Sequence, residues 1–266
     1  MIMKFAFLFS GFLSVLFLSC KDEEIVFDNE CYPLNLRSGV IAAYSFSQGS
    51  LINETSADGD LININQALPS ADRAGNPQCA YAFTNVQGNQ YLYTPSTSFL
   101  NQLDQFSISL WYQAADTTRE GGDYEVLMGR NCIQGGSHCP DRRGEWSLGL
   151  FDCRKAVFGH DNSVWMNDPV PQPSSCQEIV NTLTGNWAHI VATYDHHVYK
   201  IYYNGVLQES ESGIAGCQQH HAAQDIGDLF VGLNYKGSID DILIYNRALA
   251  DSEVAELFTL QPCCQP

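Results

Sequence analysis

Basic residues are scarce in this sequence. Its 266 residues include 13 Lys and Arg against 30 Asp and Glu, which gives a formal net charge of −17. A surface with that charge repels the phosphates of nucleic acids and of anionic lipids, so we exclude both as partners. The same charge is compatible with cation binding. Charged residues make up 16% of the chain and apolar residues 45%, which excludes a disordered chain and predicts a globular one.

Strong helical periodicity is also scarce, and turn residues recur roughly every eight to twelve positions, a pattern typical of all-β domains. The clearest segment is 185–210, where two β-branched and aromatic runs are followed by Asn204-Gly205, a sequence that favours a type I′ hairpin turn. Both faces of these runs are apolar, so a larger sheet system must surround them. We expect Trp187 and Tyr194 to belong to its core.

Expected strands cover residues 40–46, 61–64, 79–83, 90–94, 106–112, 124–128, 146–151, 156–158, 187–194, 198–203, 229–233 and 238–245. One short helix is expected at 252–258, with Asp251 as its N-cap. Residues 159–184 are expected to be irregular. The sequence shows no internal repeat and no boundary to a second domain.

The N-terminus holds a long apolar run, at residues 1–19, with one early positive charge at Lys4. This pattern predicts a secretory signal peptide rather than a permanent membrane span. Its end resembles a bacterial lipobox, which would make Cys20 the lipid-modified first residue of the mature protein; the alternative is an ordinary signal followed by an unrelated cysteine. Residues 21–24 resemble the surface-export tag of Bacteroidetes-type lipoproteins, the alternative being a plain acidic tether. We therefore expect a surface-exposed outer-membrane lipoprotein, which touches the membrane through this anchor alone.

The sequence has no CxxC pair, although it has 10 cysteines. In an exported protein the nine besides Cys20 should form disulfides, and because nine is odd at least one is unpaired within the chain. Spacing favours the pairs Cys132–Cys139 and Cys153–Cys176. The termini of a sandwich often lie close together, which favours a pair between Cys31 and either Cys263 or Cys264. Cys79 and Cys217 are left and form the last expected pair. The alternative is a zinc site formed by Cys132, Cys139, Cys153 and His160.

Four motifs occur in order: GVIAAYSF, FSISLWYQ, GNWAHIVATYD…YKIYYNGVLQ and LFVGLN…GSIDDILIYNRALADSEVAELF. Together they resemble the laminin-G-like jelly-roll domains of the concanavalin A-like lectin/glucanase superfamily, over about residues 39–260. The resemblance implies an all-β, two-sheet antiparallel jelly-roll sandwich with one short C-terminal helix. It leaves 20–38 as an acidic tether and 261–266 as a cysteine-containing tail. It does not fix the function, because this fold hosts lectins, adhesion modules, enzymes and spacers.

Catalytic motifs of that superfamily are missing. No glutamate begins the Glu-x-Asp-x-x-Glu pattern of the laminarinase-type members, which holds the acid and the nucleophile on one face of a strand. The Gln-x-His and Arg-Glu-Leu motifs of the alginate-lyase-type members are also absent. We therefore expect no catalytic residues and no enzyme activity.

Asp240-Asp241 lies in a strand whose two faces are both apolar. Neighbouring strand residues point to opposite faces, so at least one carboxylate should be partly buried and needs a partner. A structural calcium ion would serve, and related laminin-G-like domains often hold one. The expected calcium ligands are Asp240, Asp241, Asn53, Asp58, Asp60, Asp72 and Asn76. Ser47 stands where the family pattern usually has an aspartate, and the alternative is an ion pair with Arg73 or Arg247.

A sugar site needs an aromatic platform together with amide and carboxylate partners for hydroxyl groups. The candidates are Trp165, Tyr124, Asn162, Asn167 and Asp168. The alternative for Trp165 is that it packs a long loop onto the sandwich. We predict a surface-anchored, non-catalytic module that binds an extracellular glycan or protein. The other readings are a structural or assembly lipoprotein of the cell envelope and a glycan hydrolase with an unrecognised site.

Overall fold

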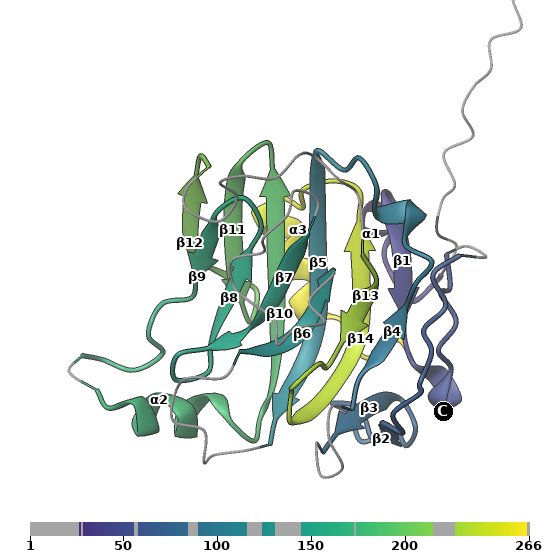
Figure 1. Cartoon of the computed structure of the whole chain (residues 1–266), viewed down its shortest axis with the longest axis horizontal. Helices are drawn as coiled ribbons and strands as arrows, with labels where there is room; N and C mark the ends of the chain where they lie inside the picture. Colours follow the sequence, from purple (N-terminus) through teal and green to yellow (C-terminus); the bar gives the residue numbers. More distant parts are fainter. Residues whose placement is uncertain are drawn as a thin grey trace, which may run out of the picture.

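A computed structural model describes residues 27, 29–55, 58–84, 90–115, 124–130, 145–172, 174–214 and 227–264. In these ranges the chain forms two antiparallel sheets packed face to face, with a few short helices outside them (Figure 1). This confirms the predicted all-β jelly-roll sandwich.

The larger sheet has eight strands in the order β12-β11-β10-β5-β14-β3-β2, with β1 paired to β14. Their bounds are β1 Val40–Tyr44, β2 Leu68–Ser70, β3 Ala80–Phe83, β5 Gln105–Ala114, β10 Trp187–Asp195, β11 Val198–Tyr203, β12 Val206–Ser212 and β14 Gly237–Tyr245. The long β5, β10 and β14 lie next to one another in the middle, so the segment that dominates the sequence also forms the centre of this sheet.

The smaller sheet has six strands in the order β4-β13-β6-β7-β8-β9. Their bounds are β4 Leu92–Thr94, β6 Glu125–Arg130, β7 Trp146–Phe151, β8 Lys155–Gly159, β9 Ser163–Trp165 and β13 Leu229–Val231. The strand expected at 61–64 is not formed, because only Ile62 makes an isolated bridge, to Tyr93.

The helices are α1 Leu34–Arg37, α2 Cys176–Leu183 and α3 Asp251–Thr259, with 3-10 turns η1 Ser47–Gly49 and η2 Ser98–Leu100. The expectation that 159–184 is irregular is wrong for β9 and α2. A capping box starts α2: Ser175 Oγ accepts the Glu178 N–H and the Glu178 carboxylate accepts the Ser175 N–H. In α3 the N-cap is Ala250 rather than the expected Asp251, which is the first helical residue.

The core between the sheets follows the period-2 alternation of the strands. Along β10 the side chains of Ala188, Ile190 and Tyr194 point inward. Trp187 therefore points outward and is half-buried, so its expected place in the core is wrong while that of Tyr194 is confirmed. The Asn204-Gly205 turn has φ of 48° and 77°, as a type I′ turn requires.

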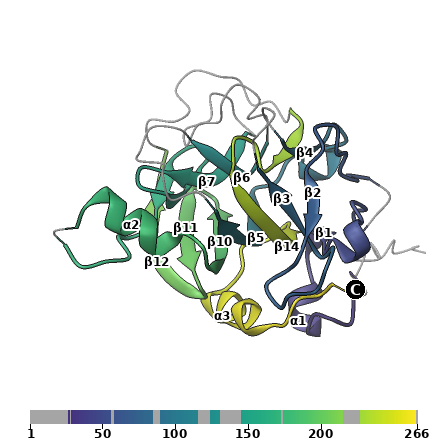
Figure 2. The same cartoon turned by 90° about the horizontal axis from the view of Figure 1, so that it is seen from below.

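The outer face of the eight-stranded sheet is covered in part by the two ends of the described chain. Phe27, Tyr32 and Leu36 are buried there in one cluster with Val254 and Leu257 of α3. Figure 2 shows α1 and α3 together on that side of the molecule. The folded body therefore includes residue 27 and residues 29–38, which the sequence analysis had assigned to a tether. In the described part of the chain, none of the helices is both long and apolar enough to cross a membrane.

Three disulfides join described cysteines: Cys31–Cys263, Cys79–Cys264 and Cys153–Cys176. Two of these are pairs that spacing and meeting termini favoured. The pairing of Cys79 with Cys217 is wrong, because the C-terminal tail folds back over the sheet and brings Cys264 to Cys79. The disulfide also removes Cys153 from the alternative zinc site. Cys20, Cys132, Cys139 and Cys217 lie outside the described residues.

Candidate functional site

Asp240 and Asp241 lie at a β-bulge in β14. The pairing of β14 with β5 shifts between Asp240 and Leu243, and Asp241 has a left-handed backbone with φ of 43°. The extra residue turns both carboxylates to the outer face, while Ile239 and Ile242 on either side of them both enter the core. The expectation that the two carboxylates point to opposite faces is therefore wrong, because it assumed a strand without a bulge.

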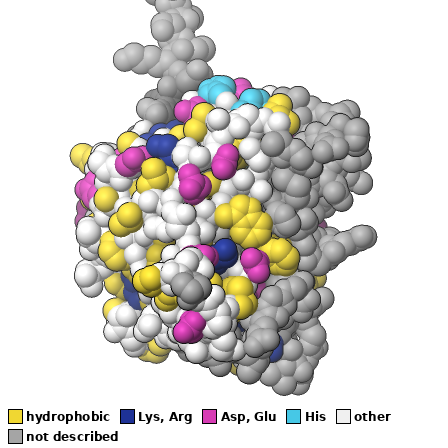
Figure 3. Space-filling model, turned by 90° about the vertical axis from the view of Figure 1, so that its left-hand side faces the viewer, with side chains coloured by type: hydrophobic (Ala, Val, Ile, Leu, Met, Phe, Trp, Pro, Cys, Tyr) yellow, Lys and Arg dark blue, Asp and Glu magenta, His cyan; other side chains and the backbone are white. Residues whose placement is uncertain are grey.

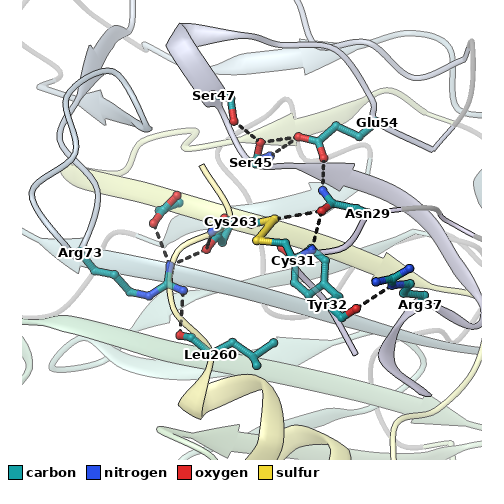
Figure 4. Close-up of a disulfide and its surroundings, with 12 residues drawn as sticks. Asn29, Cys31, Tyr32, Arg37, Ser45, Ser47, Glu54, Arg73, Leu260 and Cys263 are labelled. Carbon is teal, nitrogen blue, oxygen red and sulfur yellow. Dashed lines mark hydrogen bonds and ion pairs between the residues drawn. A yellow bond between two sulfur atoms is a disulfide. The ribbon is translucent and has the colours of Figure 1, made fainter. Parts of the chain in front are cut away.

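Arg73 supplies the positive charge for both carboxylates. Its Nη1 lies 3.0 Å from Asp240 Oδ2 and 2.6 Å from Asp241 Oδ2, and its Nη2 donates to the Leu260 carbonyl (Figure 4). Burial raises the pKa of both carboxyl groups, and for Asp240 the charge of Asp241 raises the pKa further, while Arg73 opposes the rise in both. The pair is thus buried around one guanidinium, the arrangement that the sequence analysis gave as an alternative to calcium.

A buried histidine lies beside this cluster. His189 Nε2 is 2.9 Å from Ser109 Oγ, and its ring packs against Trp111 and Phe258. Burial, helped by the charge of Arg73, lowers the pKa of His189 to about 3, so the ring is neutral at physiological pH. Ser109 and His189 are both buried, so this pair is not open to a substrate.

The other expected calcium ligands lie in two loops. In the first, the Asn53 side chain accepts the Ala43 N–H and donates to the Asp58 carbonyl, and Asp60 Oδ1 accepts the Asn53 N–H. In the second, the Asp72 carboxylate accepts bonds from the backbone and side chain of Asn76.

These side chains therefore hold their own loops in shape. Within the described ranges no group of three or more His, Cys, Asp and Glu side chains is arranged to hold a metal ion. Calcium binding stays a prediction.

Aromatic side chains gather on the outer face of the six-stranded sheet. Phe151 of β7 lies between Tyr124 and Trp165, with ring centroids 6.2 Å and 6.0 Å away. Tyr124 is 6% exposed because its ring lies over Gly149, where a Cβ would come within 2.7 Å of it, and its hydroxyl bonds with Ser147. Phe151 and Trp165 are only half-buried.

Polar side chains lie beside these two rings. Lys155 stands opposite Phe151 in the β7–β8 pairing, and its Nζ is 3.0 Å from Asp168 Oδ1. Asp168 Oδ2 accepts from the amide of Gln172. Figure 3 shows the side of the molecule that carries β9, β12 and α2, where hydrophobic side chains lie next to basic and acidic ones. We call Phe151 and Trp165, with Lys155, Asp168 and Gln172, the Trp165 platform.

Asn162 and Asn167, two other sequence candidates, join the two sheets. Asn162 donates to the Gly213 carbonyl, and Asn167 donates to the Gln208 carbonyl on β12. These bonds cover part of the free edge of β12, the outermost strand of the larger sheet. Their amide nitrogens are thus engaged in the fold, whereas Asp168 contacts Lys155, which stands opposite Phe151, the ring next to Trp165.

A second aromatic group lies at the other margin of the six-stranded sheet. Tyr91, Tyr93 and Phe230 contact one another with ring centroids 5.4 to 6.1 Å apart. The sequence analysis did not single out these residues. The signal that could have found them is the i, i+2 spacing of the two tyrosines, which places both on one face of a strand.

Comparison with known proteins agrees with this two-sheet, lectin-like architecture. The model of the concanavalin A-like lectin/glucanases superfamily matches residues 86–255. The chain therefore belongs to this superfamily, as the sequence motifs indicated. No curated protein matches the sequence.

Solved structures with the same fold include domain 4 of a GH43 extracellular arabinanase from Geobacillus stearothermophilus, in complex with arabinotriose. It is 18% identical with a TM-score of 0.56, over 84% of this chain and 98% of that one. The receptor-binding domain of botulinum neurotoxin type G is 16% identical with a TM-score of 0.58, over 84% of this chain and 52% of that one. The binding domain of botulinum neurotoxin DC, in complex with rat synaptotagmin II, is 14% identical with a TM-score of 0.59, over 84% of this chain and 52% of that one. The two neurotoxin neighbours are binding domains, and the arabinanase domain holds arabinotriose.

Proposed function

We propose that this protein is a non-catalytic module that binds an extracellular glycan on the Trp165 platform. The observation that carries the proposal is the pairing of two half-buried rings with the amide, carboxylate and ammonium of Gln172, Asp168 and Lys155. Flat apolar rings can stack on the faces of sugars, and the polar groups beside them can bind hydroxyls. The arabinanase domain, which binds arabinotriose, makes arabino-oligosaccharides the first ligands to test.

The N-terminal sequence supports an extracellular location for this binding activity. A signal at residues 1–19, a lipid anchor at Cys20 and the acidic residues after it would hold the sandwich outside the cell. We propose display on the outer membrane, where a binding module meets polysaccharide. The net charge of −17 keeps the folded body from the anionic membrane surface.

The experiment measures binding of arabinotriose, linear arabinan and a broad glycan array to the purified protein by calorimetry and array fluorescence. Trp165→Ala should weaken binding of the glycan that is found by at least about tenfold, because truncating a central aromatic contact typically costs more than about 1 kcal/mol. Leu34→Ala is the control, since it removes a side chain that is 74% exposed elsewhere on the surface. A folded wild-type protein that binds no glycan, or a Trp165→Ala variant with unchanged affinity, would contradict the proposal.

A further inference from the structure

Five outward side chains form a row across the outer face of the eight-stranded sheet. Strand register places Leu68 opposite Ala82, Ala82 opposite Ser238, Ser238 opposite Gln113 and Gln113 opposite Trp187. All five point away from the core, because their neighbours along the strands point into it. We call this row the Trp187 strip.

The Trp187 strip is not covered by the chain ends that bury the rest of this face. Leu68 is 57% exposed, and the other four side chains are half-buried. In the next row Trp111 is half-buried like Trp187, but its ring contacts Arg73 at 4.3 Å and Phe258 of α3 at 5.7 Å. Among the described residues, the ring contacts of α3 therefore reach Trp111 and not Trp187.

The side chain of Trp187 has no ring contact and no hydrogen bond with any residue in the described part of the chain, although its backbone pairs with that of Gln113. Tryptophans in folded proteins usually bury their ring and bond their N–H when they serve packing alone. Next to Trp187, the Gln113 amide nitrogen donates to the Gly185 carbonyl at 2.9 Å, which fixes the position of the amide. An accessible indole beside a fixed amide can stack on one face of a sugar and bind a hydroxyl at its edge.

A hollow of about 440 Å³ adjoins the strip where β3 lies beside β14. Ala82 and Ser238 belong to both, and the rest is lined by Phe83, Thr84, Ala115, Lys236 and Gly237. Strands in a sheet lie about 4.8 Å apart, so the five strands from β2 to β10 give the strip a length of about 19 Å. This length suits a short oligosaccharide lying across the strands.

The charge of the strip selects the kind of ligand. None of its five side chains is charged, whereas the adjoining hollow contains Lys236 and the chain as a whole carries a net charge of −17. An uncharged strip of indole, amide and hydroxyl groups complements an uncharged, polyhydroxylated chain better than an acidic or basic partner.

We propose that the Trp187 strip is a second binding site for a neutral glycan. It shares the ligand class of the proposed function. It lies on the opposite outer face of the sandwich, so binding at the strip and binding at the Trp165 platform are tested independently. Two sites on opposite faces let one molecule join two polysaccharide chains, and on a polymer they raise the apparent affinity without any new contact.

The test uses the tryptophans as four separate reporters, because the chain contains 4 of them. The indole N–H signals of the full protein are followed by NMR during titration with arabinotriose and then with other neutral oligosaccharides. Trp165 reports on the platform and Trp187 on the strip, and Trp146, which is 2% exposed in the core, is the internal control. We expect the Trp187 signal to shift in a saturable way while Trp146 stays in place.

Substitutions assign each signal to its site. Trp187→Ala should halve the number of sugars bound and lower the apparent affinity for a polymer at least about tenfold, while the Trp165 signal still titrates. A Trp187 signal that stays in place while Trp165 saturates would overturn the second site and leave the proposed function intact. A Trp187 shift that persists in Trp165→Ala, with no platform binding in the wild type, would overturn the platform and leave the strip.

Discussion

Single residues decide the electrostatics of the outer face of the larger sheet. Arg73 is the one basic side chain that contacts both Asp240 and Asp241 in the described part of the chain, and it also lies over Trp111. Removing one member of a buried ion pair costs far more than the pair contributes to stability, because the partner is left charged and dehydrated. Arg73 thus stabilises the fold because its removal would leave two buried carboxylates without a positive charge.

Replacing Arg73 with Met should lower the free energy of unfolding at pH 7 by about 3–5 kcal/mol. Lys200→Met is the matched control, because the Lys200–Asp251 pair is 32% and 61% exposed and an exposed pair contributes about 1 kcal/mol or less. Urea unfolding measures both. Equal losses in the two variants would show that the buried carboxylates do not need Arg73.

His189 should make stability depend on pH. Its pKa of about 3 in the fold lies below the usual 6.5. Between these two pH values the ring is therefore protonated in the unfolded chain and neutral in the folded chain. The contribution of the neutral ring to the free energy of unfolding is fully present above pH ~6.5. It decreases by about 1.4 kcal/mol per pH unit as the pH falls from ~6.5 to about 3. The raised pKa values of Asp240 and Asp241 act in the opposite direction, since they favour the fold as the pH falls.

A comparison with His189→Gln separates the two effects, because both chains keep the carboxylates. The difference in unfolding free energy between wild type and variant should shrink as the pH falls from 6.5 to 4.5. A difference that does not change with pH would argue against a neutral, buried ring.

Among the secondary-structure elements, the tight turns and the bulge set the side chains in place. The bulge at Asp241 brings two carboxylates to one face, and the Asn204-Gly205 turn places the start of β12 against α3. A Cβ at Gly205 would lie 3.0 Å from Phe258, so this turn also limits how close the helix comes. A turn that the sequence predicts thereby packs directly against α3.

Gly205→Ala should destabilise the protein by more than Gly213→Ala. Both glycines have a left-handed backbone, with φ of 77° and 85°, which costs an alanine about 1 kcal/mol. Only the Gly205 position adds a contact with Phe258, whereas a Cβ at Gly213 meets nothing within 4 Å. Thermal unfolding of the two variants measures the difference. A larger loss at Gly213 would show that α3 moves away without cost.

On the scale of the whole molecule, disulfides fasten both chain ends to the outer face of the larger sheet. Cys263 and Cys264 are adjacent but pair with different partners, Cys31 and Cys79, at sequence separations of 232 and 185. While either bridge is intact, the other closes a loop of only about 50 residues, because the path runs through the first bridge. The two bridges therefore constrain the unfolded chain jointly.

Removing both terminal bridges by Cys→Ser substitution should cost more than the sum of the two single removals, by about 1 kcal/mol in the chain-entropy account. Removing Cys153–Cys176, which closes a separation of 23 residues, should add to either single removal without this excess. Guanidinium unfolding of the single and paired variants measures these terms. Strict additivity at the termini would contradict the shared loop.

Local and alternating patterns let the sequence specify the sandwich, its strand-rich centre and the hairpin at Asn204-Gly205, because side-chain period and turn chemistry act over a few residues. They also placed Trp165 and Asp168 among the candidates for one sugar site, which stays a prediction. The helix at Cys176–Leu183 was missed although the sequence carries its signals, a Ser175-x-x-Glu178 capping box followed by the apolar residues Ile179, Val180 and Leu183.

Only the tertiary structure decided the rest, since it depends on what covers each face. The bulge sends Asp240 and Asp241 to Arg73, a residue 167 positions away from Asp240. The tail brings Cys264 to Cys79 in place of Cys217. The rings of Trp111 and His189 contact Phe258 of α3 and that of the half-buried Trp187 does not, on a strand where alternation alone gives inward and outward faces the same apolar character. Contacts between distant segments fixed these outcomes, and no local pattern in the chain encodes them.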